Sequence, residues 1–193
     1  CFSMSGYLLV LLAAFVTTLT ITPLLAKIAH RVNAIAYPTT RSVHTKPIPL
    51  IGGVAMIFGL MAGILTAMSL EQFDSMFKSS TEPLALVLAA GVITLVGFVD
   101  DIREVSPPAK VAGQVLAGSI MSLLGLTMLY FRIPFASFDY IVLSKDIAPV
   151  FTIAAVVVMA NAINLIDGLN GLAAGICVIA GTGLFLYSDR LFK

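Results

Sequence analysis

Two adjacent aspartates, Asp100 and Asp101, end an almost wholly apolar run in the stretch ITLVGFVDDIREVSPPAK, residues 93–110. A charged carboxylate near lipid is costly unless it has a partner, so the pair calls for a chemical reason. Successive residues on a helix point about 100° apart, so the two carboxylates cannot grip one atom symmetrically. They can take neighbouring roles, because Mg²⁺ needs only one or two carboxylates beside water and phosphate oxygens. The alternative is a solvated helix end, which the nearby Arg103 and Glu104 favour.

A second polar group lies in NAINLIDGLNGLAAG, residues 161–175. Asn161, Asn164 and Asp167 recur every third residue, so they form a polar stripe at the end of an otherwise apolar helix. Amides and a carboxylate in such a place need partners, either from other helices or from a ligand. The two glycines of DGLNG predict a sharp turn into the next apolar run. Hydrogen bonding between helices is the alternative role for the stripe.

The third group is RSVHTKPIPLIGG, residues 41–53. Arg41, His44 and Lys46 place two fixed charges and one titratable ring directly before an apolar run. Basic residues beside a membrane can bind anionic lipid headgroups, which is the alternative to substrate binding. Lys110, which follows SPPA, adds one more cation near the paired aspartates.

The composition predicts the elements that carry these groups. Hydrophobic residues make up 59% of the chain and charged residues 11%, whereas an ordinary soluble domain has about 25% charged residues. Roughly 20 apolar residues span the hydrocarbon core. Charge-free stretches of about that length cover residues 1–26, 47–70, 83–99, 111–131, 147–166 and 168–188. We therefore expect an all-α integral membrane protein, with residues 1–193 forming a single bundle of about six transmembrane helices.

Six spans would divide the junctions between two membrane faces. Residues 27–46, 100–110 and 167 fall on the first face, and residues 71–82, 132–146 and the tail fall on the second. Of the 11 Lys and Arg residues, six lie on the first face and five on the second. The positive-inside rule therefore favours the first face as cytoplasmic.

Two further features concern packing and the second face. Residues 132–149 alternate apolar and polar types and predict a small β-hairpin outside the membrane. Seven glycines inside the helical runs predict close helix packing: Gly52, Gly53, Gly59, Gly63, Gly113, Gly118 and Gly125.

Charge and cysteine content exclude several classes of function. The net charge of +1 argues against a nucleic-acid partner, and two cysteines cannot form a disulfide framework. Neither a P-loop nor a dinucleotide-binding glycine motif is present. Carboxylates, cations and amides on one membrane face are the parts of metal-assisted phosphoryl transfer. Their place at the membrane surface predicts that one substrate is a lipid that carries phosphate.

Together and in this order, the three motifs resemble those of the polyprenyl-phosphate N-acetylhexosamine-1-phosphate transferases, glycosyltransferase family 4. The resemblance covers the chain nearly end to end, and the wording of NAINLIDG is more similar to the N-acetylglucosamine branch than to the phospho-N-acetylmuramoyl-pentapeptide transferases. It implies an enzyme of the bacterial cytoplasmic membrane, with its active site on the cytoplasmic face. Such an enzyme moves a sugar-1-phosphate from a UDP-N-acetylhexosamine, with UDP-GlcNAc as the expected donor, to undecaprenyl or decaprenyl phosphate and releases UMP. The implied cofactor is Mg²⁺, with Mn²⁺ as its substitute.

The resemblance also implies roles for individual residues. Asp100 and Asp101 match a motif tied to metal binding and to handling the lipid phosphate, and Asp167 matches a catalytic aspartate. The catalytic residues are thus expected to be Asp100, Asp101 and Asp167, with Asp100 and Asp101 as the metal ligands. The substrate-binding residues are expected to be Arg41, His44, Lys46, Lys110, Asn161, Asn164 and Asn170. Direct attack and a covalent enzyme intermediate both stay open.

Two differences from the family bear on activity. The family usually has Asp where this chain has Asn170, and an amide supplies neither charge nor a general base. Family members have about ten spans, with a further Asp motif and a His-rich loop after the sixth. We therefore expect this chain to correspond to the N-terminal part of such a transferase and to show little or no transfer alone.

Several alternatives stay open at this stage. One is a phospho-N-acetylmuramoyl-pentapeptide transferase, and another is an inactive half that binds lipid phosphate. A third is a cation transport protein, which would favour carboxylates spread through the depth of the membrane. A homodimer is also compatible with the sequence.

Overall fold

The computed structural model describes residues 4–32, 34–36, 47–131, 141–169 and 171–191. Six long helices follow the six apolar stretches one for one: α1 (Met4–Arg31), α2 (Gly52–Met68), α4 (Glu82–Ile102), α5 (Pro107–Leu123), α6 (Ala148–Ile166) and α7 (Leu172–Leu191). A 3₁₀ turn η1 (Glu71–Phe73) and the short helix α3 (Asp74–Ser79) connect α2 to α4. The strands have two residues each: β1 (Ile35–Ala36), β2 (Ile48–Pro49), β3 (Tyr130–Phe131) and β4 (Ile141–Val142). The expected all-α membrane fold is confirmed.

Fewer than six of the described helices have the length and hydropathy of a membrane span. Within the described residues, α1, α4 and α6 are long and apolar enough to cross a membrane. The pair made of α2 and residues 71–79 adds a fourth if it counts as one span, although it is bent by 97°. The apolar part of α7 is shorter, and the 17 residues of α5 reach about 26 Å, less than the ~30 Å hydrocarbon core. The predicted six spans are therefore not confirmed.

The ends of α5 explain its shortness. We expected an apolar helix over residues 111–131, but α5 runs from Pro107 to Leu123. Proline fits the first turn of a helix, so α5 begins before the apolar run does. Gly125 has a φ of +101°, a conformation that side chains disfavour, and it turns the chain out of the helix. The prediction that Gly125 lies inside a helix was wrong.

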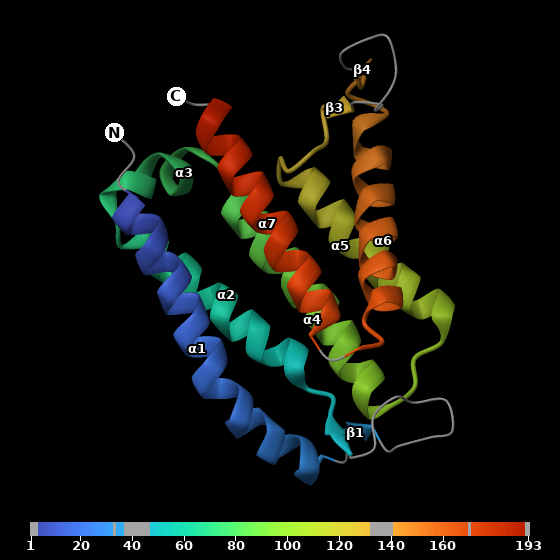
Figure 1. Cartoon of the computed structure of the whole chain (residues 1–193). Helices are drawn as coiled ribbons and strands as arrows, with labels where there is room; N and C mark the ends of the chain where they lie inside the picture. The colour runs from blue at the N-terminus through green and yellow to red at the C-terminus, as the bar shows by residue number, and fades with distance from the viewer. Residues whose placement is uncertain (1–3, 33, 37–46, 132–140, 170, 192–193) are drawn as a thin grey trace.

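The helices place the predicted chemistry at one end of the bundle (Figure 1). At this end α1, α4 and α6 finish, and α2, α5 and α7 begin. We call it the aspartate end, because it contains Asp100, Asp101 and Asp167. The opposite end holds α3, the β3–β4 pair and the C-terminal end of α7. The described parts of the three junctions that we assigned to one membrane face thus lie at one end of the bundle.

Small residues form the contacts between the helices. In the described residues, the buried apolar positions are almost all alanines, and no large side chain is fully buried. Large apolar side chains instead face outward, as shown by the exposures of Leu123 (84%) and Leu165 (83%). This distribution suits a lipid surrounding, where small residues let helices approach and large residues face the acyl chains.

Close approach at glycines is confirmed at four of the predicted positions. A Cβ on Gly59 would meet α1 2.9 Å from the carbonyl oxygen of Ala14, and Gly63 faces the same helix. A Cβ on Gly113 would lie 2.5 Å from Cγ2 of Val96, and one on Gly118 would lie 2.9 Å from Cα of Ile153. At Gly52 and Gly53 no other described residue comes within 4 Å of an added Cβ, so close helix packing is not seen at these two positions.

Two short antiparallel pairs join segments outside the helices. Ile35 pairs with Pro49 and Ala36 with Ile48, which draws together the two ends of the basic segment before α2. Tyr130 pairs with Val142 and Phe131 with Ile141. The predicted hairpin is confirmed in type, but its strands flank residues 132–140, which lie outside the described residues.

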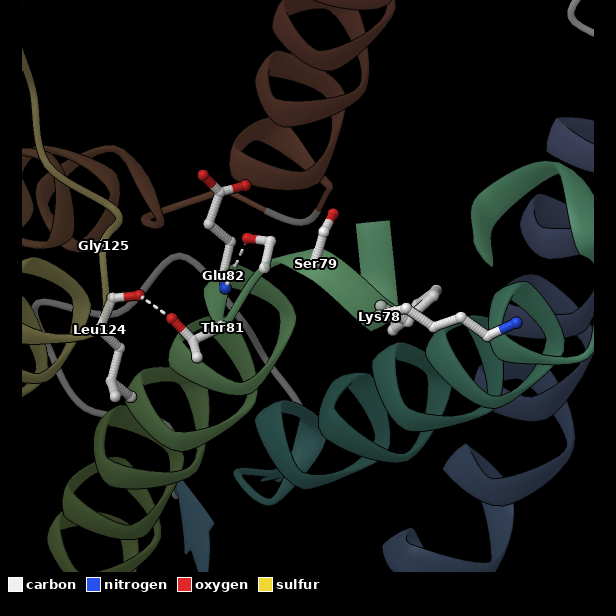
Figure 2. Close-up of a pocket in the computed structure, with 8 residues that line it drawn as sticks. Lys78, Ser79, Thr81, Glu82, Leu124 and Gly125 are labelled. Carbon is white, nitrogen blue, oxygen red and sulfur yellow. Dashed lines mark hydrogen bonds between the residues drawn. The ribbon is translucent and has the colours of Figure 1, made fainter. Parts of the chain in front are cut away.

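The opposite end of the bundle is hollowed but carries none of the predicted chemistry (Figure 2). A hollow of about 480 Å³ is lined there by Lys78, Ser79, Glu82 and Gly125, among others. The hydroxyl of Thr81 donates to the carbonyl oxygen of Leu124 at 2.6 Å, which ties the start of α4 to the end of α5. The candidate site must be sought at the aspartate end.

Candidate active site

Asp100 is held in the last turn of α4 by two contacts. The backbone N–H of Val105 donates to its Oδ1 at 3.0 Å, which folds the chain back on the helix end. The ammonium group of Lys110 lies 2.7 Å from its Oδ2. The side chains of Lys110 and Asp100 are 42% and 30% exposed, so water reaches this ion pair and weakens it in part.

The sequence of the α4–α5 connection explains why Lys110 reaches Asp100. Ser106 is extended, as a residue before proline prefers, and Pro107 opens α5. The backbone N–H of Lys110 donates to the carbonyl oxygen of Ser106 at 3.1 Å, so Lys110 lies in the first turn of α5. The connection is short enough to keep this turn beside the last turn of α4.

The end of α4 is also anchored from the other side. Ala29, Ala34 and Ile51 form a buried apolar cluster, and Phe98 packs against it. Phe98 precedes Asp100 by two residues. Its contact with the cluster therefore holds the last turn of α4 against α1 and against the start of α2. The helix end that carries the aspartates is therefore held by both α5 and the N-terminal part of the chain.

Asp101 differs from Asp100 in its surroundings. It is half-buried, and it makes no hydrogen bond or ion pair with any residue that the structure describes. Among the described residues, each oxygen of Asp100 has one partner and keeps a further lone pair, whereas the oxygens of Asp101 have no partner. The two adjacent aspartates therefore have different surroundings in the fold.

The predicted stripe on α6 divides into two parts. Asn161 is half-buried, and its Nδ2 donates to Oε1 of Gln114 on α5 at 2.7 Å and to the carbonyl oxygen of Val157 at 2.8 Å. Asn164 and Asp167 are exposed at the aspartate end. The interhelical role that we weighed for the stripe thus describes Asn161, while Asn164 and Asp167 remain accessible to a ligand.

Asp167 ends α6, as the glycine-rich sequence predicted. Its backbone N–H donates to the carbonyl oxygen of Ile163 at 3.0 Å, and a turn follows. Gly171 has a φ of +81° and immediately precedes α7. This compact joint keeps Asp167 at the end of α6 rather than on a long loop.

Several predicted residues cannot be placed, because Arg41, His44, Lys46 and Asn170 lie outside the described residues. The β1–β2 pair does place the two ends of the segment that contains the first three at the aspartate end. Gln114 ends the motif GFVDDIREVSPPAKVAGQ, but it was not among the expected site residues. The signal available was its place in α5 four residues after Lys110, on the same helix face.

The carboxylates at the aspartate end are the described groups that could hold Mg²⁺. No group of three acidic, histidine or cysteine side chains able to hold a metal occurs among the described residues. Asp167 therefore does not join Asp100 and Asp101 in a shared carboxylate cluster. Two adjacent carboxylates still fit Mg²⁺, since this ion takes one or two carboxylates and keeps several water or phosphate ligands. Asp101, with its available oxygens, and Asp100 beside it would hold the ion.

Comparison with known proteins agrees with the motifs. The family described as glycosyl transferase family 4 matches residues 83–191. The chain is 36% identical to the decaprenyl-phosphate N-acetylglucosaminephosphotransferase of Mycobacterium leprae, over 96% of this chain and 46% of that protein. It is 29% identical to the undecaprenyl-phosphate alpha-N-acetylglucosaminyl 1-phosphate transferase of Yersinia pestis, over 84% of this chain and 42% of that protein.

A more distant likeness extends to the other branch of the family. The phospho-N-acetylmuramoyl-pentapeptide-transferase of Mycobacterium avium is 33% identical over 66% of this chain and 40% of that protein. No solved structure matches the chain. The chain spans about half the length of the curated relatives that it matches.

The helical bundle and the polar groups at its aspartate end define a membrane-embedded protein. The match over residues 83–191 then places it: the chain belongs to glycosyl transferase family 4.

Proposed function

We propose that the protein containing this chain transfers N-acetylglucosamine-1-phosphate from a UDP-sugar to a polyprenyl phosphate. The observation that supports this most strongly is that Asp100, Lys110 and Asp167 lie at helix ends on the same end of the bundle. The names of the relatives supply the acceptor class, decaprenyl or undecaprenyl phosphate, and the N-acetylglucosamine group. The aspartate end would face the bacterial cytoplasm, where nucleotide sugars are found.

The reaction needs charge control more than covalent chemistry. An oxygen of the lipid phosphate forms a bond to the β-phosphorus of the UDP-sugar, and the bond from that phosphorus to the bridging oxygen breaks. The electron pair leaves with UMP, and the sugar phosphate stays on the lipid as a diphosphate. A two-step route through an enzyme carboxylate has the same overall balance. In either route the catalyst must bring two anions together, which is a task of positioning and neutralisation.

The described residues can divide this work. Lys110 supplies a fixed cation beside the helix end, and its contact with Asp100 sets where that charge lies. Asp101 and Asp100 would hold Mg²⁺, which supplies charge neutralisation at the diphosphate when bound. Asp167, exposed at the end of α6, is placed to act on the acceptor or on the transferred group.

The transport alternative finds no support in this arrangement. A cation path would favour carboxylates spread through the depth of the membrane, whereas Asp100, Asp101 and Asp167 all lie at one end of their helices. Glu82 starts α4 at the opposite end, and no other described residue of α4 between Glu82 and Asp100 is charged.

The test is an assay of the protein encoded by the complete reading frame that contains these residues, called the complete protein below. Purified in detergent with undecaprenyl phosphate, Mg²⁺ and labelled UDP-GlcNAc, it should give a labelled lipid and UMP in equal amounts. UDP-N-acetylmuramoyl-pentapeptide as the donor separates the two branches of the family. Product from that donor alone would reject the N-acetylglucosamine assignment, and product from neither would reject transfer. The 193-residue chain, assayed beside it, should give little or none.

A further inference from the structure

We propose that Gln114 is a positioning residue that acts through Asn161 and Lys110, an inference that rests on the transferase function proposed above. Gln114 lies on α5 between Lys110, at the start of that helix, and Gly118, where α5 comes close to α6. Its side chain makes the polar link between α5 and α6 at the aspartate end.

The contact has the geometry of a fixed amide pair. Nδ2 of Asn161 lies 2.7 Å from Oε1 of Gln114 and 2.8 Å from the carbonyl oxygen of Val157. Both amide hydrogens of Asn161 are therefore used, one within α6 and one across to α5. Both side chains are half-buried, where a hydrogen bond to an amide is stronger than in water.

The same face of α5 leads to the ion pair. Gln114 follows Lys110 by four residues, so the two side chains lie one turn apart on one face of the helix. Lys110 contacts α4 through Asp100, and Gln114 contacts α6 through Asn161. A rotation or slide of α5 that broke the amide pair would also move Lys110 away from Asp100.

Other contacts hold α5 and α6 together without Gln114. Gly118 allows close approach to Ile153 on α6 in the middle of the interface. At the opposite end, the backbone N–H of Met128 donates to the hydroxyl of the buried Thr152 at 2.8 Å. Loss of the amide pair should therefore loosen the aspartate end and leave the rest of the interface in place.

The test compares three variants of the complete protein. Gln114→Leu removes the acceptor and puts an apolar side chain of similar size in its place. Thr152→Val is the matched control, because it breaks a hydrogen bond at the other end of the α5–α6 region. The double variant Gln114→Asn with Asn161→Gln exchanges the two amides, so that the combined length of the pair is kept.

Two readouts separate positioning from mere stability. Spin labels at the exposed positions Val111 and Leu165, in a cysteine-free background, report the distance between α5 and α6 at the aspartate end. Labels at Leu123 and Val150 report it at the opposite end. The second readout is transfer, with kcat and the KM for UDP-GlcNAc measured separately.

We expect Gln114→Leu to broaden or shift the distance at the aspartate end only and to lower kcat roughly tenfold to a hundredfold, since small displacements of a positioned group cost that much. Thr152→Val should change the other distance and leave kcat within about twofold, and the amide exchange should restore at least part of kcat. A normal kcat in Gln114→Leu, or an equal loss in Thr152→Val, would overturn the proposal. Distances unchanged by Gln114→Leu would overturn it even if the unaltered protein transferred no sugar, so its failure is distinguishable from failure of the proposed function.

Discussion

The ammonium group of Lys110 and Oδ2 of Asp100 are 2.7 Å apart and belong to different helices, α5 and α4. The other oxygen of Asp100 accepts the backbone N–H of Val105 from the connection between those helices. One carboxylate thus joins the end of α4, the connection and the start of α5. Asp101, its neighbour in the sequence, has no such partners among the described residues and is left for a ligand.

Replacement of Lys110 by Met should remove the cation beside Asp100 and leave its Oδ2 without an ion-pair partner. We expect transfer by the complete protein to fall roughly a hundredfold, the usual effect of losing one charge-stabilising group. The rate of labelled lipid formation measures it. Lys78→Met is the matched control, because Lys78 forms an exposed ion pair with Asp74 at the opposite end. That variant should keep full activity, and an equal loss in both variants would contradict a local role for Lys110.

Substitution of Gly118 by Ala should destabilise the bundle, because the new Cβ would lie 2.9 Å from Cα of Ile153. Overpacking of this kind costs about 1–3 kcal/mol. Gly91→Ala on α4 is the control, since no atom lies within 4 Å of its added Cβ. Alanine is favoured over glycine inside a helix, so that variant should be equally stable or gain up to about 1 kcal/mol. Thermal unfolding in detergent compares them, and a Gly118→Ala protein as stable as Gly91→Ala would show that the two helices do not touch there.

The two glycines between α6 and α7, Gly168 and Gly171, should differ in how much stability is lost when each is replaced by alanine. Gly171 has a φ of +81°, so Gly171→Ala should lose about 1–2 kcal/mol of stability, and Gly171→Asn should lose less, because Asn adopts this conformation more readily. Gly168 has neither a positive φ nor a neighbour within 4 Å of an added Cβ, so Gly168→Ala should behave like the unaltered protein. Unfolding midpoints in detergent test the order. Equal midpoints for Gly171→Ala and Gly168→Ala would mean that the turn does not need a left-handed residue.

The helices could be predicted from the sequence because each is built around a long apolar run, and the charged residues of α1, α4, α5 and α7 lie near the ends of those helices. Their ends were harder to place. Pro107 starts α5 before the apolar run begins and Gly125 stops it early, so local backbone preferences outweighed hydrophobicity. The bend of 97° after α2 depends on packing that composition does not reveal.

The sequence identifies the aspartates of the candidate site, but it does not predict which side chains they contact. The motifs led to Asp100, Asp101 and Asp167, and their common end of the bundle follows from the alternating direction of the helices. The pairing of Asp100 with Lys110 depends on the length and proline geometry of the α4–α5 connection. The pairing of Asn161 with Gln114 depends on the register of α5 against α6, which residue spacing within one helix cannot give.

Binding of Mn²⁺ in place of Mg²⁺, followed by electron paramagnetic resonance, tests whether the paired aspartates hold the metal. In the complete protein with UDP-GlcNAc present, we predict one bound ion per chain. Asp101→Asn and Asp100→Asn should each weaken its binding by at least about tenfold, while Asp167→Asn should keep the ion and lose transfer. Unchanged binding in both Asp100→Asn and Asp101→Asn would contradict a metal site at the end of α4, and with it the proposed division of work among the three aspartates.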